Sequence, residues 1–233
     1  MKPYRILLFD ADDTLFDFQK AEEQALDKAL QMHGFPHDEA IKQDYKKINS
    51  ELWQAFEKGL IDKEAIKSQR FTRLFQQYQI AYDGTLFNEE YLRYLGEGSD
   101  LLPDALAVCA RLAEDFDLYL VTNGIAQTQR SRLDRSALKP YIKKMFVSEE
   151  SGYQKPQKEY FAYVEARIPD FAHDQVLLIG DSLASDMTGG IHAGYDVCWF
   201  NPHHKQNEEH LPLTYEIDDL RALFDILYGS EKR

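Results

Sequence analysis

The chain has 233 residues, enough for one large domain or for one domain with a smaller domain inserted in it. Its formal net charge is -13 at pH 7, and it contains no long basic run. Because nucleic-acid polymers and anionic membranes are bound by clustered Lys and Arg, this balance argues against both as the main partner. No apolar run approaches the roughly 20 residues that a membrane-spanning helix needs.

The two cysteines, Cys109 and Cys198, each lie inside an apolar segment. We expect both to be buried free thiols rather than a disulfide or metal ligands. The sequence begins a strand pattern almost at once and shows no signal-peptide pattern. We therefore expect a cytoplasmic protein that is a monomer or a homodimer.

Five short apolar runs lack the polar alternation of a half-exposed sheet and predict buried parallel strands. They span residues 6–9, 118–121, 145–147, 176–179 and 197–200. Helical patterns at about 103–115, 125–137, 157–167 and 184–193 lie between the predicted strands. We expect Pro103 in the first turn of its helix, with Asp104 adding a favourable negative charge. This alternation predicts an α/β fold, a Rossmann-like open parallel sheet with right-handed crossovers.

The first crossover departs from this rhythm, because residues 16–95 are helical almost throughout. Amphipathic patches at 21–32, 45–57 and 63–78 are separated by turn residues such as Gly34, Gly59 and Asp83-Gly84. We predict an all-helical domain over 16–95, inserted into an α/β domain made of 1–15 and 96–233. Ligands of open α/β sheets bind beyond the carboxyl ends of the strands. An insertion that leaves from this edge is expected to form a lid over the site.

The first predicted strand runs directly into Asp10 and Asp12, two carboxylates that can both face the carboxyl edge of the sheet. One can be a nucleophile and metal ligand, and the other an acid and base near the leaving group. A polar turn with helix-capping aspartates is the simpler interpretation of this segment taken alone. The second strand ends in Thr122-Asn123-Gly124, which can donate hydrogen bonds to phosphate oxygens but is also an ordinary strand-to-helix turn.

Lys155 precedes a proline where a helix begins, a place where the helix dipole disfavours positive charge. A neighbouring anion, such as Asp10 or a substrate phosphate, would explain it, although a solvated lysine is the simpler alternative. After the fourth strand, Asp181 can project from the strand end while Asp186 lies on the first turn of the next helix. Carboxylate oxygens so placed suit Mg²⁺.

Taken together, these segments resemble the haloacid dehalogenase-like (HAD) hydrolase superfamily along nearly the whole chain. The segment DADDTL resembles its first motif, TNG its second, Lys155 its third and GDSLASD its fourth. The helical insertion is similar to the superfamily's C1-type cap. The segments 9–16 and 198–202 look most like those of bacterial pyrimidine 5′-nucleotidases.

The resemblance implies a role for each motif residue in a phosphatase. Asp10 would attack phosphorus, and Asp12 would protonate the leaving alcohol and then activate the hydrolytic water. Thr122 and the backbone of Asn123 and Gly124 would hold the phosphoryl group, and Lys155 would offset the charge between it and Asp10.

The same resemblance implies a Mg²⁺ site and a small phosphorylated metabolite as the substrate. Asp181, the Asp10 carboxylate and the Asp12 carbonyl oxygen would bind the ion, with Asp186 acting directly or through water. The expected substrates are nucleoside 5′-monophosphates, with sugar or glycolate phosphates as the alternative.

A 2-haloacid dehalogenase of the same superfamily would share Asp10 and Lys155, but it does not need an acid/base at the position of Asp12. Outside enzymes, a receiver-like signalling domain or a phosphate-binding protein could use a similar set of residues. A receiver domain is about half this length and has no helical insertion after its first strand. No side chain expected for turnover is missing, so we favour the enzyme.

Overall fold

The computed structural model describes residues 4–229 of the chain. It divides into two compact units, one formed by the chain up to Asp17 and from Asp100 on, and one formed by Phe18–Ser99. The sequence predicts 16–95 for the inserted domain, whereas the second unit itself runs from Phe18 to Ser99.

The first unit is built on a six-stranded sheet in the order β3-β2-β1-β4-β5-β6, and every neighbouring pair is parallel. Its strands are β1 (Ile6–Phe9), β2 (Asp117–Thr122), β3 (Lys144–Val147), β4 (Val176–Gly180), β5 (Asp196–Phe200) and β6 (Tyr215–Ile217). The predicted α/β class is confirmed. The predicted count of five strands was one too low, because β6 is a short edge strand with the polar Glu216 at its centre.

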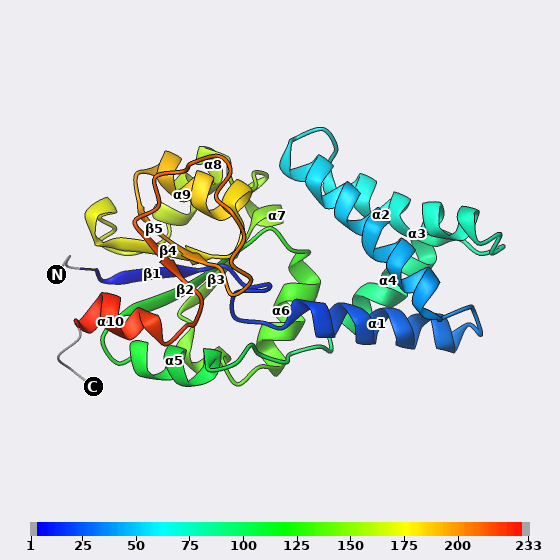
Figure 1. The fold of residues 1–233 in the computed structure, drawn as a ribbon, viewed down its shortest axis with the longest axis horizontal. Helices are drawn as coiled ribbons and strands as arrows, with labels where there is room; N and C mark the ends of the chain where they lie inside the picture. The colour runs from blue at the N-terminus through cyan, green and yellow to red at the C-terminus, as the bar shows by residue number, and fades with distance from the viewer. Residues whose placement is uncertain (1–3, 230–233) are drawn as a thin grey trace. The chain divides into compact units, whose positions relative to one another are not determined.

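Both faces of this sheet are covered by helices, as Figure 1 shows. Leu7 and Phe9 of β1 pack on the face that carries α5 (Ala105–Leu112) and α10 (Ala222–Tyr228). Ile6 and Leu8 pack on the opposite face, against α8 (Lys158–Glu165). Because successive side chains of a strand point to opposite faces, a strand covered on both sides must be apolar throughout. This is why the buried strands appear in the sequence as unbroken apolar runs.

The remaining helical segments of this unit follow strands or connect them. They are α6 (Ala126–Arg135), α7 (Ser148–Ser151), α9 (Thr188–Ala193), two 3₁₀ turns (Lys139–Tyr141 and His173–Gln175) and a π turn (Leu183–Met187). The helix α10 was not predicted from the sequence.

One local prediction at a helix start was wrong. Helix α5 begins at Ala105, so Pro103 does not lie in its first turn. Asp104 is the N-cap residue, with a left-handed backbone (φ 61°), and its side chain makes no capping hydrogen bond. Its carboxylate instead pairs with Arg221, which precedes α10.

The second unit contains four helices that share one core: α1 (Phe18–Met32), α2 (Glu39–Glu57), α3 (Lys63–Gln77) and α4 (Gly84–Leu95). The last three begin at aspartate N-caps, whose side chains accept hydrogen bonds from the free N–H groups of the first turn. Aromatic rings dominate this core: Phe71 packs edge-on against Phe87 with ring centroids 4.7 Å apart.

Cys109 and Cys198 are both buried and free, as predicted. Burial raises the pKa of the Cys109 thiol to about 12, so it stays protonated and unreactive. No helix within residues 4–229 is long and apolar enough to cross a membrane.

Candidate active site

Polar side chains converge where β1, β2 and β4 end. Carboxylate oxygens of Asp10, Asp181 and Asp186 lie within 4.8 Å of one another. Strand order reverses between β1 and β4, because the chain builds β2 and β3 on one side of β1 and β4 to β6 on the other. Ligand sites of open α/β sheets occupy such switch points. The acidic cluster therefore lies where the topology leaves a crevice.

A buried lysine joins two of these carboxylates. The Lys155 ammonium donates to Asp10 Oδ1 at 2.5 Å, to Asp186 Oδ1 at 2.7 Å and to the Val121 carbonyl at 3.0 Å. These contacts use all three of its N–H donors. Burial by itself lowers the pKa of Lys155, but the two carboxylates more than offset this and raise it above its usual value. The lysine is therefore a permanent cation beside Asp10, as the sequence suggested.

The Asp10 carboxylate is held at both oxygens. Oδ1 contacts Lys155, and Oδ2 accepts a 3.4 Å hydrogen bond from the buried Thr14 hydroxyl. Burial raises the pKa of Asp10, and the Lys155 ammonium opposes that rise. The backbone N–H of Asp10 donates to the Ile179 carbonyl at 2.8 Å, which anchors the residue between β1 and β4. Such a carboxylate is a well-oriented candidate nucleophile.

Asp181 follows β4 and has a different environment. Burial, together with the charges of Asp186 and Asp13, raises the pKa of Asp181 to about 7. Its backbone carbonyl accepts a 2.9 Å hydrogen bond from the indole of Trp199 on β5, which fixes the turn after the strand. A carboxyl group destabilised by burial and like charge becomes a stable anion when a cation lies beside it.

The position of Asp186 depends on Gly180. A Cβ atom at Gly180 would lie 2.4 Å from the carboxylate of Asp186, so only glycine leaves room for it. Asp186 lies on the π turn, and its Oδ2 accepts a 3.2 Å hydrogen bond from the Ser182 N–H. With its other oxygen on Lys155, Asp186 positions the lysine as well as adding negative charge.

The side chain of Asn123 makes two hydrogen bonds to the backbone of Lys155. Its side-chain nitrogen donates to the Lys155 carbonyl at 3.0 Å, and its side-chain oxygen accepts from the Lys155 N–H at 2.9 Å. The Asn123 amide is thus used to hold the backbone from which Lys155 reaches the site. The sequence pattern alone suggested instead that this amide donates to a phosphate.

A second polar network surrounds Asp12. Its Oδ1 pairs with Arg132, and its Oδ2 accepts a 2.8 Å hydrogen bond from Gln129 Nε2. The same Gln129 nitrogen donates to the Thr122 hydroxyl oxygen at 2.9 Å, and the Gly124 N–H donates to that oxygen at 3.0 Å. Thr122 therefore accepts two hydrogen bonds, which leaves its own O–H as a donor toward a substrate.

Seven of the eight residues singled out in the sequence belong to these hydrogen-bond networks, and the carboxylate of Asp181 lies within 4.8 Å of those of Asp10 and Asp186. Four further residues, which were not predicted from the sequence, hold the motif residues in place: Thr14, Gln129, Arg132 and Trp199. Gln129 and Arg132 follow the TNG segment three positions apart on α6, so they lie on one face of that helix. This spacing alone did not reveal them, because α6 has few apolar residues to indicate which of its faces is buried.

The acidic cluster fits a hard divalent cation. Three carboxylates share a small volume, and burial and mutual repulsion raise the pKa of both Asp10 and Asp181. Lys155 contacts Asp10 and Asp186, so one cation is already present beside two of the three anions. Oxygen donors of this type are those that Mg²⁺ prefers, together with waters and a substrate oxygen.

Comparison with known proteins agrees with this geometry. The family model described as haloacid dehalogenase-like hydrolase matches residues 4–194. The HAD-hydrolase YfnB of Bacillus subtilis is 46% identical over 97% of both chains. The pyrimidine 5′-nucleotidase PynA of Streptococcus pneumoniae is 38% identical over 96% of this chain and 95% of its own. The pyrimidine 5′-nucleotidase YjjG of Escherichia coli is 30% identical over 95% and 96%, respectively.

Solved structures show the same relationship. Magnesium-bound YfnB has a TM-score of 0.92, with 97% of this chain and 99% of that chain covered. The L-2-haloacid dehalogenase of Xanthobacter autotrophicus has a TM-score of 0.77 at 17% identity, a likeness that concerns the fold alone. The chain therefore belongs to the haloacid dehalogenase-like hydrolase family and is an enzyme of the phosphoric monoester hydrolase type.

Proposed function

We propose that this enzyme is a magnesium-dependent phosphatase that hydrolyses pyrimidine nucleoside 5′-monophosphates through an aspartyl-phosphate intermediate. One observation carries the mechanism: an oriented Asp10 carboxylate with a buried ammonium 2.5 Å from its Oδ1, inside a cluster of further carboxylates. The identity of 38% and 30% to two pyrimidine 5′-nucleotidases along nearly the whole chain supports the substrate class.

In the first step, a carboxylate oxygen of Asp10 attacks phosphorus and the bond to the ester oxygen breaks. The leaving alkoxide takes a proton from the Asp12 carboxyl group and departs as the nucleoside. Asp12 suits this role because it lies two residues after Asp10, with only the buried Ala11 between them. Proton transfer by a positioned group typically contributes about 10²–10⁴-fold to the rate.

In the second step, the Asp12 carboxylate takes a proton from a water molecule as that water attacks phosphorus. The acyl-phosphate bond breaks, inorganic phosphate leaves, and Asp10 is restored as a carboxylate. Lys155 offsets negative charge in both steps, because it lies within hydrogen-bond distance of Asp10 and stays protonated. The free O–H of Thr122 would donate to a phosphoryl oxygen.

A bound Mg²⁺ would neutralise charge on the phosphoryl group and help to orient it. Asp10 and Asp181 are the side chains that we assign to it, and the Asp12 carbonyl stays a predicted ligand. Asp186 is proposed to bind the ion directly or through water, and its oxygens also accept hydrogen bonds from Lys155 and from the Ser182 N–H.

The decisive experiment is phosphate release from a panel of phosphorylated metabolites, with Mg²⁺ and with EDTA. The panel compares pyrimidine and purine 5′-monophosphates with sugar phosphates and phosphoglycolate. We expect release to need Mg²⁺ and kcat/KM to be highest on UMP, CMP or dTMP. The Asp10→Asn variant serves as the control for contaminating phosphatases.

Two other outcomes would change the proposal in different ways. Equal kcat/KM on nucleotides and sugar phosphates would keep the mechanism and remove the substrate assignment. Chloride release from 2-chloropropionate, with no phosphate release from any ester, would replace the phosphatase with a dehalogenase. That second outcome is disfavoured by the buried network around Asp12, which dehalogenation does not require.

A further inference from the structure

Arg132, the arginine that pairs with Asp12, is almost completely buried. Only 1% of its side chain is exposed. Burying a guanidinium is costly unless its N–H groups meet acceptors, and Arg132 meets at least two acceptors here. It pairs with Asp12 Oδ1 and donates to Gln129 Oε1 at 3.0 Å. Its guanidinium also lies over the Phe16 ring, 4.8 Å from the centroid.

Gln129 is oriented by three neighbours. Its Oε1 accepts from Arg132, while its Nε2 donates to both Asp12 Oδ2 and the Thr122 hydroxyl. A flipped amide would place its nitrogen against the arginine and its oxygen against a carboxylate, so this orientation is the one the contacts allow. Space for the side chain exists because Gly124 has no Cβ, which would lie 2.7 Å from Gln129.

Asp12 needs such support because it lies on a loop and its side chain is 26% exposed. Left alone, a carboxylate in this position could rotate away from the leaving group. Arg132 and Gln129 each hold one of its oxygens, and each oxygen keeps a second lone pair on which a proton can be carried. Gln129 also ties Asp12 to Thr122, so the proton-transfer group and the expected phosphate donor keep a fixed separation.

We propose that Gln129 and Arg132 are positioning residues that hold the Asp12 carboxylate in the geometry for proton transfer to the leaving group. The inference rests on the proposed phosphatase function, and it assigns a role to two residues outside the four sequence motifs. Neither residue would touch the reacting atoms. Misplacing a reacting group by about 1 Å can cost about 10²-fold in rate, so their effect is measurable.

The test uses the leaving group as the readout. p-Nitrophenolate is stable as an anion and leaves without a proton, whereas the 5′-oxygen of a nucleoside needs one. The value of kcat/KM reports only the steps up to departure of the leaving group. For Arg132→Met and Gln129→Leu, we expect kcat/KM on UMP to fall about 10- to 100-fold. On p-nitrophenyl phosphate we expect kcat/KM to change less than about threefold. This leaving group needs no proton from Asp12, and the variants leave the binding of the substrate unchanged.

A second readout follows the hydrolytic step. Asp12 must also deprotonate water, so the variants should accumulate the phosphorylated enzyme when p-nitrophenyl phosphate is the substrate. We expect a burst of p-nitrophenol followed by slower turnover. Asp12→Asn should show the same two signatures with larger amplitude, and Arg132→Lys should recover part of the loss on UMP.

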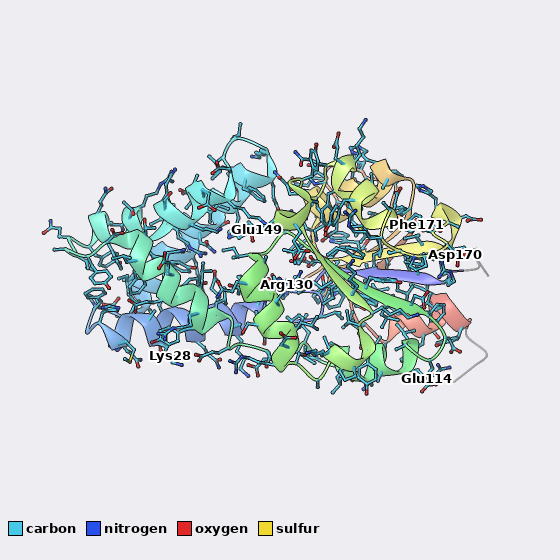
Figure 2. All side chains as sticks on the ribbon, turned by 180° about the vertical axis from the view of Figure 1, so that it is seen from behind. Lys28, Glu114, Arg130, Glu149, Asp170 and Phe171 are labelled. Atoms are coloured by element: carbon cyan, nitrogen blue, oxygen red, sulfur yellow. The ribbon has the colours of Figure 1, made fainter. Side chains whose placement is uncertain are left out.

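Arg130→Gln is the matched control. Arg130 lies two positions before Arg132 on α6, where Figure 2 labels it, and its exposed side chain pairs with Glu150. We expect its kcat/KM on both substrates to equal that of the wild type. Equal losses on UMP and p-nitrophenyl phosphate in Arg132→Met and Gln129→Leu would overturn the inference and leave the proposed function intact. A wild-type enzyme inactive on both esters would instead overturn the proposed function.

Discussion

Among residues 4–229, each unit buries one arginine almost completely, and the two arginines are used in different ways. Arg132 on α6 is 1% exposed and meets the carboxylate of Asp12. Arg70 on α3 is 2% exposed and donates to the side-chain oxygens of Asn88 at 2.7 Å and Asn49 at 3.3 Å. Its guanidinium also lies 4.7 Å from the centre of the Tyr91 ring.

The difference shows that burial of a charge does not by itself mark a site of chemistry. Arg70 lies among amide groups and aromatic rings, which disperse its charge without offering a reactive group. A carboxylate is linked to it only indirectly in these contacts: Asn49, which accepts from Arg70, donates to Glu22 at 2.8 Å. Arg132 contacts an ionisable group on the loop that carries the candidate nucleophile. We therefore expect changes near Arg132 to alter rates and changes at Arg70 to alter stability.

The largest expected effect is the loss of turnover in Asp10→Asn. The amide cannot form the acyl-phosphate, so we expect kcat to fall at least about 10⁴-fold, as is typical when a nucleophile is removed. The fold should persist, because the variant removes one charge from a crowded acidic cluster. Phosphate release and the thermal midpoint, measured on the same sample, check both parts. Residual activity above a few per cent would exclude Asp10 as the nucleophile.

A pair of glycine variants separates site geometry from packing. In Gly180→Ala the new Cβ would meet the Asp186 carboxylate at 2.4 Å, so Asp186 must move and release Lys155. We expect a kcat loss of about 10-fold or more and a destabilisation of about 1–3 kcal/mol. In Gly190→Ala the Cβ would instead meet Val197 at 2.6 Å.

The Gly190→Ala variant is the control for that pair. Its added methyl group crowds the sheet without touching the candidate active site, so the destabilisation should be similar and kcat should stay near the wild-type value. The measurements are kcat at 25 °C and urea unfolding of each variant. Similar kcat losses in both variants would show that packing strain, and not the position of Asp186, controls the rate.

Much of this site could be read from the sequence, because its residues follow apolar strands whose carboxyl ends must meet. The lysine before a proline suggested a neighbouring anion such as Asp10, but it was the resemblance to the family that implied the place of Lys155 beside Asp10. Gln129 and Arg132 could not be placed in the same way, because α6 has few apolar residues to indicate its buried face. Their partners, Asp12 and Thr122, lie on other elements of the fold, and only folding brings the four side chains together.

For the fold as well, features that depend on a local sequence pattern could be predicted, whereas contacts between distant residues could not. Apolar runs located five strands, while β6 escaped because three residues at a sheet edge carry too little pattern. Asp104 was expected to favour a helix start through its charge, yet it pairs with Arg221, a residue 117 positions away. Arg70 could not be recognised as buried, since its partner Asn88 lies on another helix.

The comparison of the two arginines predicts a stability effect in Arg70→Met. The variant leaves Asn88 Oδ1 without its 2.7 Å donor and removes the contact with the Tyr91 ring. We expect a loss of about 2–4 kcal/mol in unfolding free energy, because buried acceptors lose their partners. The UMP to p-nitrophenyl phosphate ratio of kcat/KM should stay at the wild-type value. A change in that ratio without a loss of stability would show that Arg70, like Arg132, acts on the rate, and would contradict the difference proposed between the two arginines.

The smallest expected effect is a pH-dependent stabilisation by Mg²⁺. The pKa of Asp181 is about 7 in the folded protein and near 3.8 in the unfolded chain. Between these values the folded state binds a proton that the unfolded state has lost, so raising the pH removes stability from the metal-free enzyme. A cation at the cluster requires the ionised carboxylate, so its benefit must grow as the pH rises through 7. The guanidinium of Arg70 does not titrate in this range and adds nothing to this pH dependence.

Thermal midpoints with Mg²⁺ and with EDTA, at pH 5.5 and pH 8, test this linkage. At saturating Mg²⁺ the difference at pH 8 should be on the order of 5 °C, and it should be smaller at pH 5.5. Asp181→Asn should lose the pH dependence, whereas Arg70→Met should start from a lower midpoint and keep the full Mg²⁺ increment. If the increment were the same at both pH values, proton release from Asp181 would not be coupled to the metal. Loss of the pH dependence in Asp181→Asn, together with retention of the increment in Arg70→Met, would place the metal response at the acidic cluster and not at the buried charge of the helical unit.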